Sequence, residues 1–110
     1  MADTAKVAFL QRLQQVEDVV QKSAAATLTI LETRVRGDTT SSAFTLTLPA
    51  PEKAAGLTYI IQANRSGSNN LTVAFTGVSP DGSQAIAVDE GYVVAHSFGH
   101  MWVVLAKKLT

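Results

Sequence analysis

The chain has no cysteine and few charged or aromatic residues. Of its 110 residues, 16% are charged and 6% are aromatic, whereas 46% are hydrophobic. Without cysteine there are no disulfides and no thiolate sites, so durability must come from packing or from association with other chains. Soluble domains usually carry about 25% charged residues. The missing charge therefore predicts that part of the surface is covered by another chain rather than by water.

Neither sign of charge is in excess, and long hydrophobic runs are also absent. Nine basic residues balance nine acidic ones, which argues against a nucleic-acid partner because such binding needs clustered Lys and Arg. No stretch approaches the roughly 18 apolar residues of a membrane span, so we expect no membrane partner. The N-terminal run lacks the uninterrupted apolar core of a signal peptide, so we expect synthesis in a cytoplasm without the usual export route.

Residues 1–26 are predicted to form an N-terminal helix that serves oligomerisation or docking. Asp3 or Thr4 can cap its start by accepting backbone N–H bonds. Apolar residues then recur at intervals of four, three and four, which places them on one helical stripe. This stripe consists of Phe9, Leu13, Val16 and Val20. The alternative is that the helix packs on its own domain.

Residues 27–110 are predicted to form a small antiparallel β-sandwich or barrel of about seven strands. Short segments rich in β-branched and aromatic residues alternate with Gly, Pro, Asn, Asp and Ser. The expected strands are 28–36, 43–48, 57–63, 70–75, 84–88, 91–97 and 101–106. No helical period interrupts them, so a parallel α/β fold is not expected. The fold class is mainly β, preceded by one helix.

The order of these segments resembles a recurring β-domain of bacteriophage virion proteins, found in tail fibres, head fibres and capsid-decorating proteins. The resemblance covers about residues 42–106. It is carried by the segments "TLTLPAPEKAAGLTYII", "SGSNNLTV", "SPDGSQAIAV", "EGYVVAHS" and "SFGHMWVVL".

The resemblance implies a structural role in a virion, most often as a homotrimer that contacts the major capsid protein or another virion protein. Long fibres carry extended repeats or shafts, whereas only one short helix is predicted before the β-domain of this chain. The resemblance therefore favours a capsid decoration (cement) protein on the outer surface of the head. Aromatic rings are expected to anchor the core or an interface, since each buries a large area. These anchors are Phe44, Tyr59, Phe75, Tyr92 and Trp102.

Two other functions remain open from the sequence. The first is a short tail-fibre, head-fibre or adaptor protein that binds a host glycan or receptor through exposed loops. The loop residues proposed for this are Asn64, Arg65, Asn69, Asn70 and Asp81. The second is a carbohydrate-binding β-module.

Catalysis and metal binding are not expected. The chain lacks a nucleophile elbow, a phosphate-binding loop and a dinucleotide fingerprint. His96 and His100 lie four residues apart, near Asp89 and Glu90. However, four residues across a turn do not align two metal ligands as they do on a helix. We therefore expect one solvent-facing and one hydrogen-bonded histidine, no cofactor and no enzyme activity.

Overall fold

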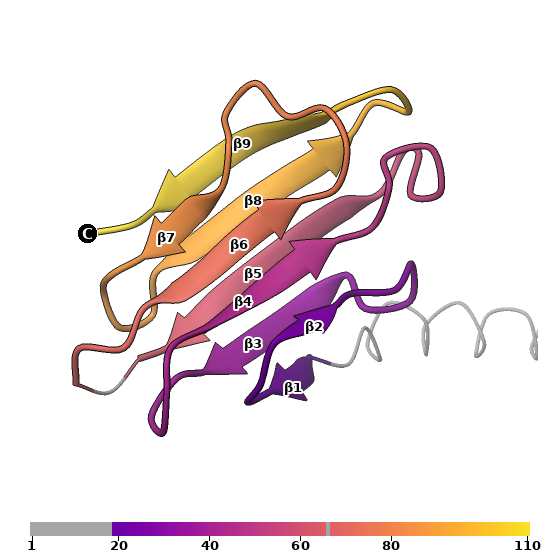
Figure 1. Ribbon diagram of the computed structural model, residues 1–110. Coiled ribbons are helices and arrows are strands. Elements are labelled where there is room, and N and C mark those ends of the chain that lie inside the picture. The colour runs from indigo at the N-terminus through magenta and orange to yellow at the C-terminus, as the bar shows by residue number, and fades with distance from the viewer. Residues whose placement is uncertain (1–18, 66) are drawn as a thin grey trace, which may run out of the picture.

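The computed structural model describes residues 19–65 and 67–110, and in this part the chain is mainly β. These residues form nine strands, which are arranged in two layers (Figure 1). The strands are β1 (Val20–Lys22), β2 (Ala26–Thr27), β3 (Arg34–Asp38), β4 (Phe44–Leu48), β5 (Thr58–Asn64), β6 (Leu71–Phe75), β7 (Gln84–Ile86), β8 (Tyr92–Ser97) and β9 (Trp102–Lys108).

The two layers are mixed sheets rather than antiparallel ones. Sheet A has the strand order β1-β3-β5-β8-β9 and sheet B has the order β2-β4-β6-β7. In sheet A, β1, β3 and β5 pair in parallel and β8 and β9 continue antiparallel. In sheet B, β2, β4 and β6 are parallel and β7 is antiparallel.

Parallel pairing arises here without helices because the chain alternates between the sheets. From β1 to β6, each strand in sheet A is followed by one in sheet B, so strands two apart in sequence become parallel neighbours. The returning strand supplies the crossover that a parallel pair needs, a role more often filled by a helix. The sequence-based expectation of an antiparallel domain was therefore wrong for the first six strands.

The predicted helix also needs correction where the structure describes it. Residues 20–22 form β1, residues 23–25 form a loop and Ala26 begins β2, so the part of the predicted helix beyond residue 18 is not helical. Val20 lies half-buried against the core and pairs with Val35 of β3. Pairing with an existing strand outweighs local periodicity over so few residues. Phe9, Leu13 and Val16 lie outside the described residues.

The core between the sheets is built from alternating strand residues and two central rings. Tyr59 and Trp102 are fully buried and pack edge to face, with ring centroids 5.4 Å apart. Phe75 lies tilted against Trp102 at 6.0 Å. Phe44 is half-buried at the core margin. Tyr92, in contrast, points outward from β8 and is 37% exposed.

The proline-rich connection between β4 and β5 closes one end of this core. Pro49 and Pro51 cannot continue a strand ladder because they lack an N–H group. Their carbonyl oxygens instead accept hydrogen bonds from Trp102 Nε1 at 2.9 Å and from Ser97 Oγ at 2.7 Å. Gly56 takes a positive φ of 81°, which glycine adopts without strain, and the chain then re-enters sheet A. The connection between these strands thus caps this end of the core, with Pro49, Pro51 and Ala54 buried beneath exposed residues 52, 53, 55 and 56.

The tripeptide Arg36-Gly37-Asp38 forms the end of β3, and Gly37 permits a close approach of the two sheets there. Gly37 is in β3 and faces the core, where an added Cβ would lie 2.6 Å from the Leu71 side chain of sheet B. Arg36 and Asp38 point to the opposite, outer side of the sheet. The tripeptide is therefore part of a strand rather than an exposed loop, and Gly37 alone makes the close contact with sheet B.

Candidate functional site

The two ends of the sandwich differ in chemical character. We call the end formed by loops 28–33, 49–57, 76–83 and 98–101 the apolar end, and the end formed by loops 23–25, 39–43, 65–70 and 87–91 the polar end. The strand directions place each set of loops together, and the C-terminus lies at the polar end, on the left of Figure 1.

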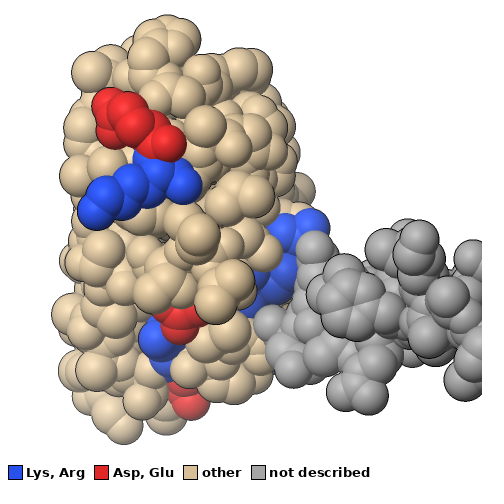
Figure 2. Space-filling view, turned by 90° about the vertical axis from the view of Figure 1, so that its right-hand side faces the viewer, with Lys and Arg blue, Asp and Glu red and all other residues tan. Residues whose placement is uncertain are grey.

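Exposed large hydrophobic side chains are concentrated at the apolar end. Among the described residues, seven such side chains are exposed, and four of them lie in apolar-end loops. These four are Ile30, Leu31, Val78 and Phe98. Figure 2 looks onto this end, and most of the surface in view is formed by uncharged residues. Single exposed apolar residues are ordinary, but a group of them at one end indicates a contact surface.

The loop that carries Ile30 and Leu31 is a turn held by its own polar groups. Thr29 N donates to Glu32 Oε1 at 3.0 Å, and Leu31 N donates to Thr29 Oγ1 at 3.3 Å. The bond from Thr29 N to the Glu32 side chain is one half of a Thr-x-x-Glu capping box, whereas the Thr29 hydroxyl accepts from Leu31 N rather than from Glu32 N. Since this loop lies inside the segment predicted as a continuous strand, 28–36, the sequence analysis missed it. The Thr-x-x-Glu spacing was the signal that could have found it.

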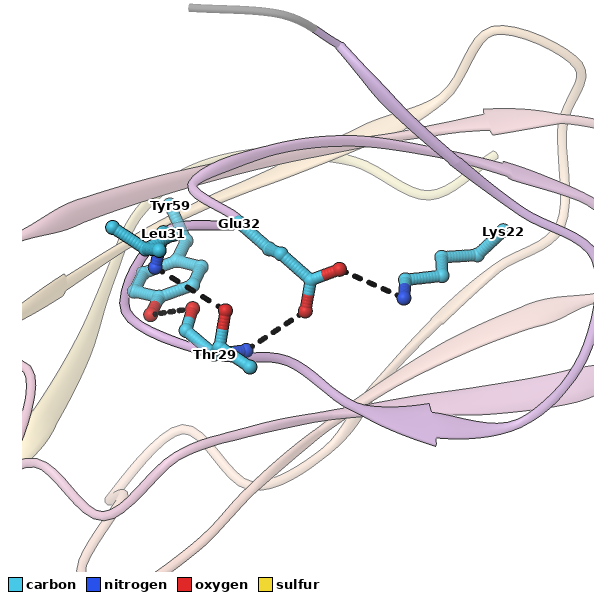
Figure 3. Close-up of polar contacts among 5 residues, drawn as sticks. All are labelled: Lys22, Thr29, Leu31, Glu32 and Tyr59. Carbon is cyan, nitrogen blue, oxygen red and sulfur yellow. Dashed lines mark hydrogen bonds and ion pairs between the residues drawn. The ribbon is translucent and has the colours of Figure 1, made fainter.

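The same turn is fastened to the core and to β1. Tyr59 Oη donates to the Thr29 carbonyl at 2.7 Å, and Lys22 Nζ lies 2.8 Å from Glu32 Oε2 (Figure 3). Lys22 and the Thr29 backbone N–H hold the pKa of Glu32 below its usual value. Burial, with a smaller contribution from the Glu32 charge, raises the pKa of Tyr59 to about 12. Glu32 is thus kept charged and Tyr59 is kept protonated near neutral pH.

A depression of about 260 Å³ lies on the outer face of sheet A. Its apolar lining includes Val19, Ile60 and Tyr92, and its polar lining consists of Arg34, Arg36 and Gln62. Arg36 contacts Glu90 at 3.4 Å, whereas its buried Nε has no hydrogen-bond partner. The depression is therefore mainly apolar with two arginines beside it.

The polar end is tied together by side-chain to backbone hydrogen bonds. Asn69 Nδ2 donates to the Thr39 carbonyl at 3.0 Å, and Thr39 Oγ1 donates to the Asn69 carbonyl at 2.8 Å. Arg65 N donates to Asp89 Oδ1 at 2.8 Å. Thr40 lowers the pKa of Asp38 through its hydroxyl and its backbone N–H. These polar groups hold three loops in place.

The structure divides the loop residues proposed for receptor binding between the two ends. Asn64, Arg65, Asn69 and Asn70 lie at the polar end, where Arg65 Nε donates to Asn70 Oδ1 at 3.2 Å. Asp81 lies at the apolar end, and its Oδ2 accepts a hydrogen bond from Val104 N at 2.9 Å. Asp81 therefore fastens the β6–β7 loop to β9 and shares no surface with the asparagines.

The two histidines do not form a metal site in the described part of the chain. His96 Nδ1 lies 2.8 Å from Thr58 Oγ1, and His100 Nδ1 lies 3.3 Å from the Phe98 carbonyl. Residues 19–65 and 67–110 contain no group of three or more His, Cys, Asp or Glu side chains that could hold a metal ion. In the same residues no helix has the length and hydropathy to cross a membrane.

Comparison with protein-family models and with curated proteins gives no match to this chain.

Proposed function

We propose that the protein is a non-enzymatic structural protein of a bacteriophage virion, a homotrimer that decorates the outer surface of the head. The observation that carries this proposal is the unequal character of the two ends. An apolar end suits attachment to a protein shell, and a polar, internally bonded end suits exposure to water. The segments that resemble phage β-domains include the cap at 49–57 and the hairpin formed by β8 and β9.

In this proposal, each copy attaches to the head by burying apolar surface, and the three copies of a trimer bind together. Burial contributes about 25 cal/mol per Å² of apolar surface removed from water. A trimer that engages three symmetric sites gains further by avidity, without any new type of contact. Phe98 and Val78, 55% and 61% exposed, are the side chains that we assign to the shell contact.

Co-sedimentation with assembled heads that lack the protein tests this function. We expect the wild-type chain to pellet with the heads and Phe98→Asp to bind at least tenfold more weakly, because a charge would enter an apolar contact. Ser68→Asp, at the polar end, is the matched control and should bind like the wild type. Failure of the wild-type chain to bind such heads would refute the decoration role.

A second candidate is a short fibre or adaptor that binds a host glycan or receptor. The polar end favours it, since Asn, Ser and Thr side chains are suited to hydrogen bonding with sugars. The internal hydrogen bonds of Asn69 and Asn70 argue against it, because these groups are already engaged. Binding to host cells that Ser68→Asp abolishes and Phe98→Asp leaves intact would favour this candidate.

A further inference from the structure

The depression on sheet A is a second apolar surface, separate from the apolar end. Among the described residues, three exposed large hydrophobic side chains lie outside the apolar-end loops, and two of them, Val19 and Tyr92, line the depression. Ile60 of the central strand β5 adds a third apolar side chain to its lining. The contact with the head proposed above does not cover these side chains.

The charged side chains of the depression are engaged within the chain. Arg36 pairs with Glu90 at 3.4 Å. Arg34 Nη1 donates to the carbonyl oxygens of Thr33 and Thr58, at 3.3 and 3.2 Å. Because both guanidinium groups already have contacts, the depression does not call for an anionic ligand. Its remaining surface is suited to aliphatic or aromatic side chains.

The described part of the chain begins at the depression itself. Residues 1–18 join it at Val19, which lines the depression. We call residues 1–18 the N-terminal segment. A residue spans at most about 3.6 Å, so Val16 lies within about 11 Å of Val19 in any conformation. Such a tether gives the segment an effective concentration of the order of millimolar at the depression, which a separate chain would have to match.

The apolar stripe of the N-terminal segment has the length and chemistry that the depression requires. On the predicted helix, Phe9, Leu13 and Val16 extend over about 10 Å, at about 1.5 Å per residue. The depression reaches across β3, β5 and β8, which are successive neighbours in sheet A. At about 4.8 Å per strand, the outer two of these strands also lie about 10 Å apart. The stripe carries no charge that burial would penalise.

We propose that the N-terminal segment folds back on its own chain and places Phe9, Leu13 and Val16 in the sheet A depression. This inference decides between the two roles that the sequence leaves open for the predicted helix, in favour of packing on its own domain. The apolar end stays free for contact with another protein. The inference does not rest on the virion role, and it makes the N-terminal segment part of the domain.

Engineered disulfides test this position in the full chain. The chain has no cysteine, so Leu13→Cys combined with Ile60→Cys can form a disulfide without a background reaction. The bond requires the two Cβ atoms to lie about 4 Å apart. Gln15→Cys combined with Ile60→Cys is the matched control, because residue 15 lies about 200° around a helix from residue 13 and is nearer to Val19 along the chain.

The oxidation rates of the two pairs give the result. A docked segment should form the Leu13 disulfide roughly tenfold faster than the Gln15 disulfide, since only the first pair meets the distance requirement. A segment that moves freely would favour Gln15, because a shorter loop closes more readily. Gels run without reducing agent distinguish a bond within one chain from a bond between chains. Equal rates, a faster Gln15 pair or bonds formed mainly between chains overturn the inference.

Methyl NMR gives a test that leaves the depression intact. Leu13→Asp should shift the methyl resonances of Ile60, because a carboxylate does not enter an apolar site. The resonances of Ile86, which is fully buried between the sheets, should stay in place. Gln15→Asp is the control and should shift neither. Ile60 resonances that do not respond to Leu13→Asp overturn the inference, even if a cysteine variant fails to fold.

The outcomes separate this inference from the proposed function. Docking of the segment in a chain that does not bind heads refutes the decoration role alone. Binding to heads by a chain whose two cysteine pairs oxidise at equal rates refutes the docking alone.

Discussion

Replacing Trp102 by alanine should remove a large part of the stability of the fold. Trp102 is fully buried, packs against Tyr59 at 5.4 Å and Phe75 at 6.0 Å, and donates to the Pro49 carbonyl at 2.9 Å. Truncation of a buried aromatic residue to alanine costs about 3–5 kcal/mol. The variant also removes the hydrogen-bond donor for a buried carbonyl at the cap.

Urea unfolding followed by circular dichroism measures this loss. With a slope of about 1.5 kcal/mol per molar, the midpoint should fall by about 2 to 3 M urea. Protein concentration must be held fixed, because oligomerisation adds to apparent stability. Trp102→Phe, which keeps a ring but loses the donor, should cost about 1–2 kcal/mol. Phe98→Ala, at an exposed position, should stay within about 0.5 kcal/mol of the wild type.

A midpoint for Trp102→Ala within 0.5 M of the wild type would contradict this reasoning, since the rule of about 3–5 kcal/mol assumes a closed core around the indole. Such a result would place Trp102 on a surface that opens readily, and the Pro49 cap would then be a loose loop. An equal loss in Trp102→Phe and Trp102→Ala would instead assign most of the effect to the hydrogen bond.

Three further outcomes can be checked together. The lowered pKa of Glu32 contributes stability that is present above pH 4.5 and is lost as the pH falls through the folded pKa. In a plot of the unfolding midpoint against pH, Glu32→Gln should therefore show a smaller decrease in acid than the wild type. The raised pKa of Tyr59 contributes stability that is present below pH 10 and is lost between pH 10 and about 12. Tyr59→Phe should remove this loss of the unfolding midpoint in alkali, and a variant that keeps it would contradict the raised pKa of Tyr59. Gly91→Ala should lower the thermal midpoint markedly, because its Cβ would lie 2.5 Å from the Lys108 carbonyl oxygen, and an unchanged melting temperature would show that β8 shifts freely.

Much of the fold could be predicted from local sequence. The alternation of Phe44, Leu46 and Leu48 predicted β4, and the alternation of Leu71, Val73 and Phe75 predicted β6, because a strand with one buried face needs period two. The Asp81-Gly82 pair predicted a turn, and Gly82 indeed takes a φ of 67°. These are local decisions, made by side-chain shape and backbone freedom.

The pairing of strands could not be predicted in the same way. The alternating patterns of β3 and β5 are typical of antiparallel strands, yet the two strands are parallel neighbours. Alternation reports only that one face of the strand is buried, and it does not report the direction of the neighbouring strand. The direction follows from the alternation of the chain between sheets, which depends on contacts far apart in sequence. The same limit explains the error at residues 20–22, which were predicted to be helical. These residues form β1 because they pair with β3, and this partner lies outside the local sequence pattern.

The sequence by itself determined the strand-forming segments, the turns, the buried aromatic rings Tyr59 and Trp102, and the shortage of charge. Only the tertiary structure decided where the exposed hydrophobic side chains gather, because strand directions bring the four apolar-end loops together. The tertiary structure also decided that Ile30 and Leu31 are exposed to solvent. The turn that carries them is held by Tyr59 of β5, which donates to the Thr29 carbonyl, and by Lys22 of β1, which pairs with Glu32. Local patterns record which residues prefer burial, whereas three-dimensional contacts determine which of them remain exposed.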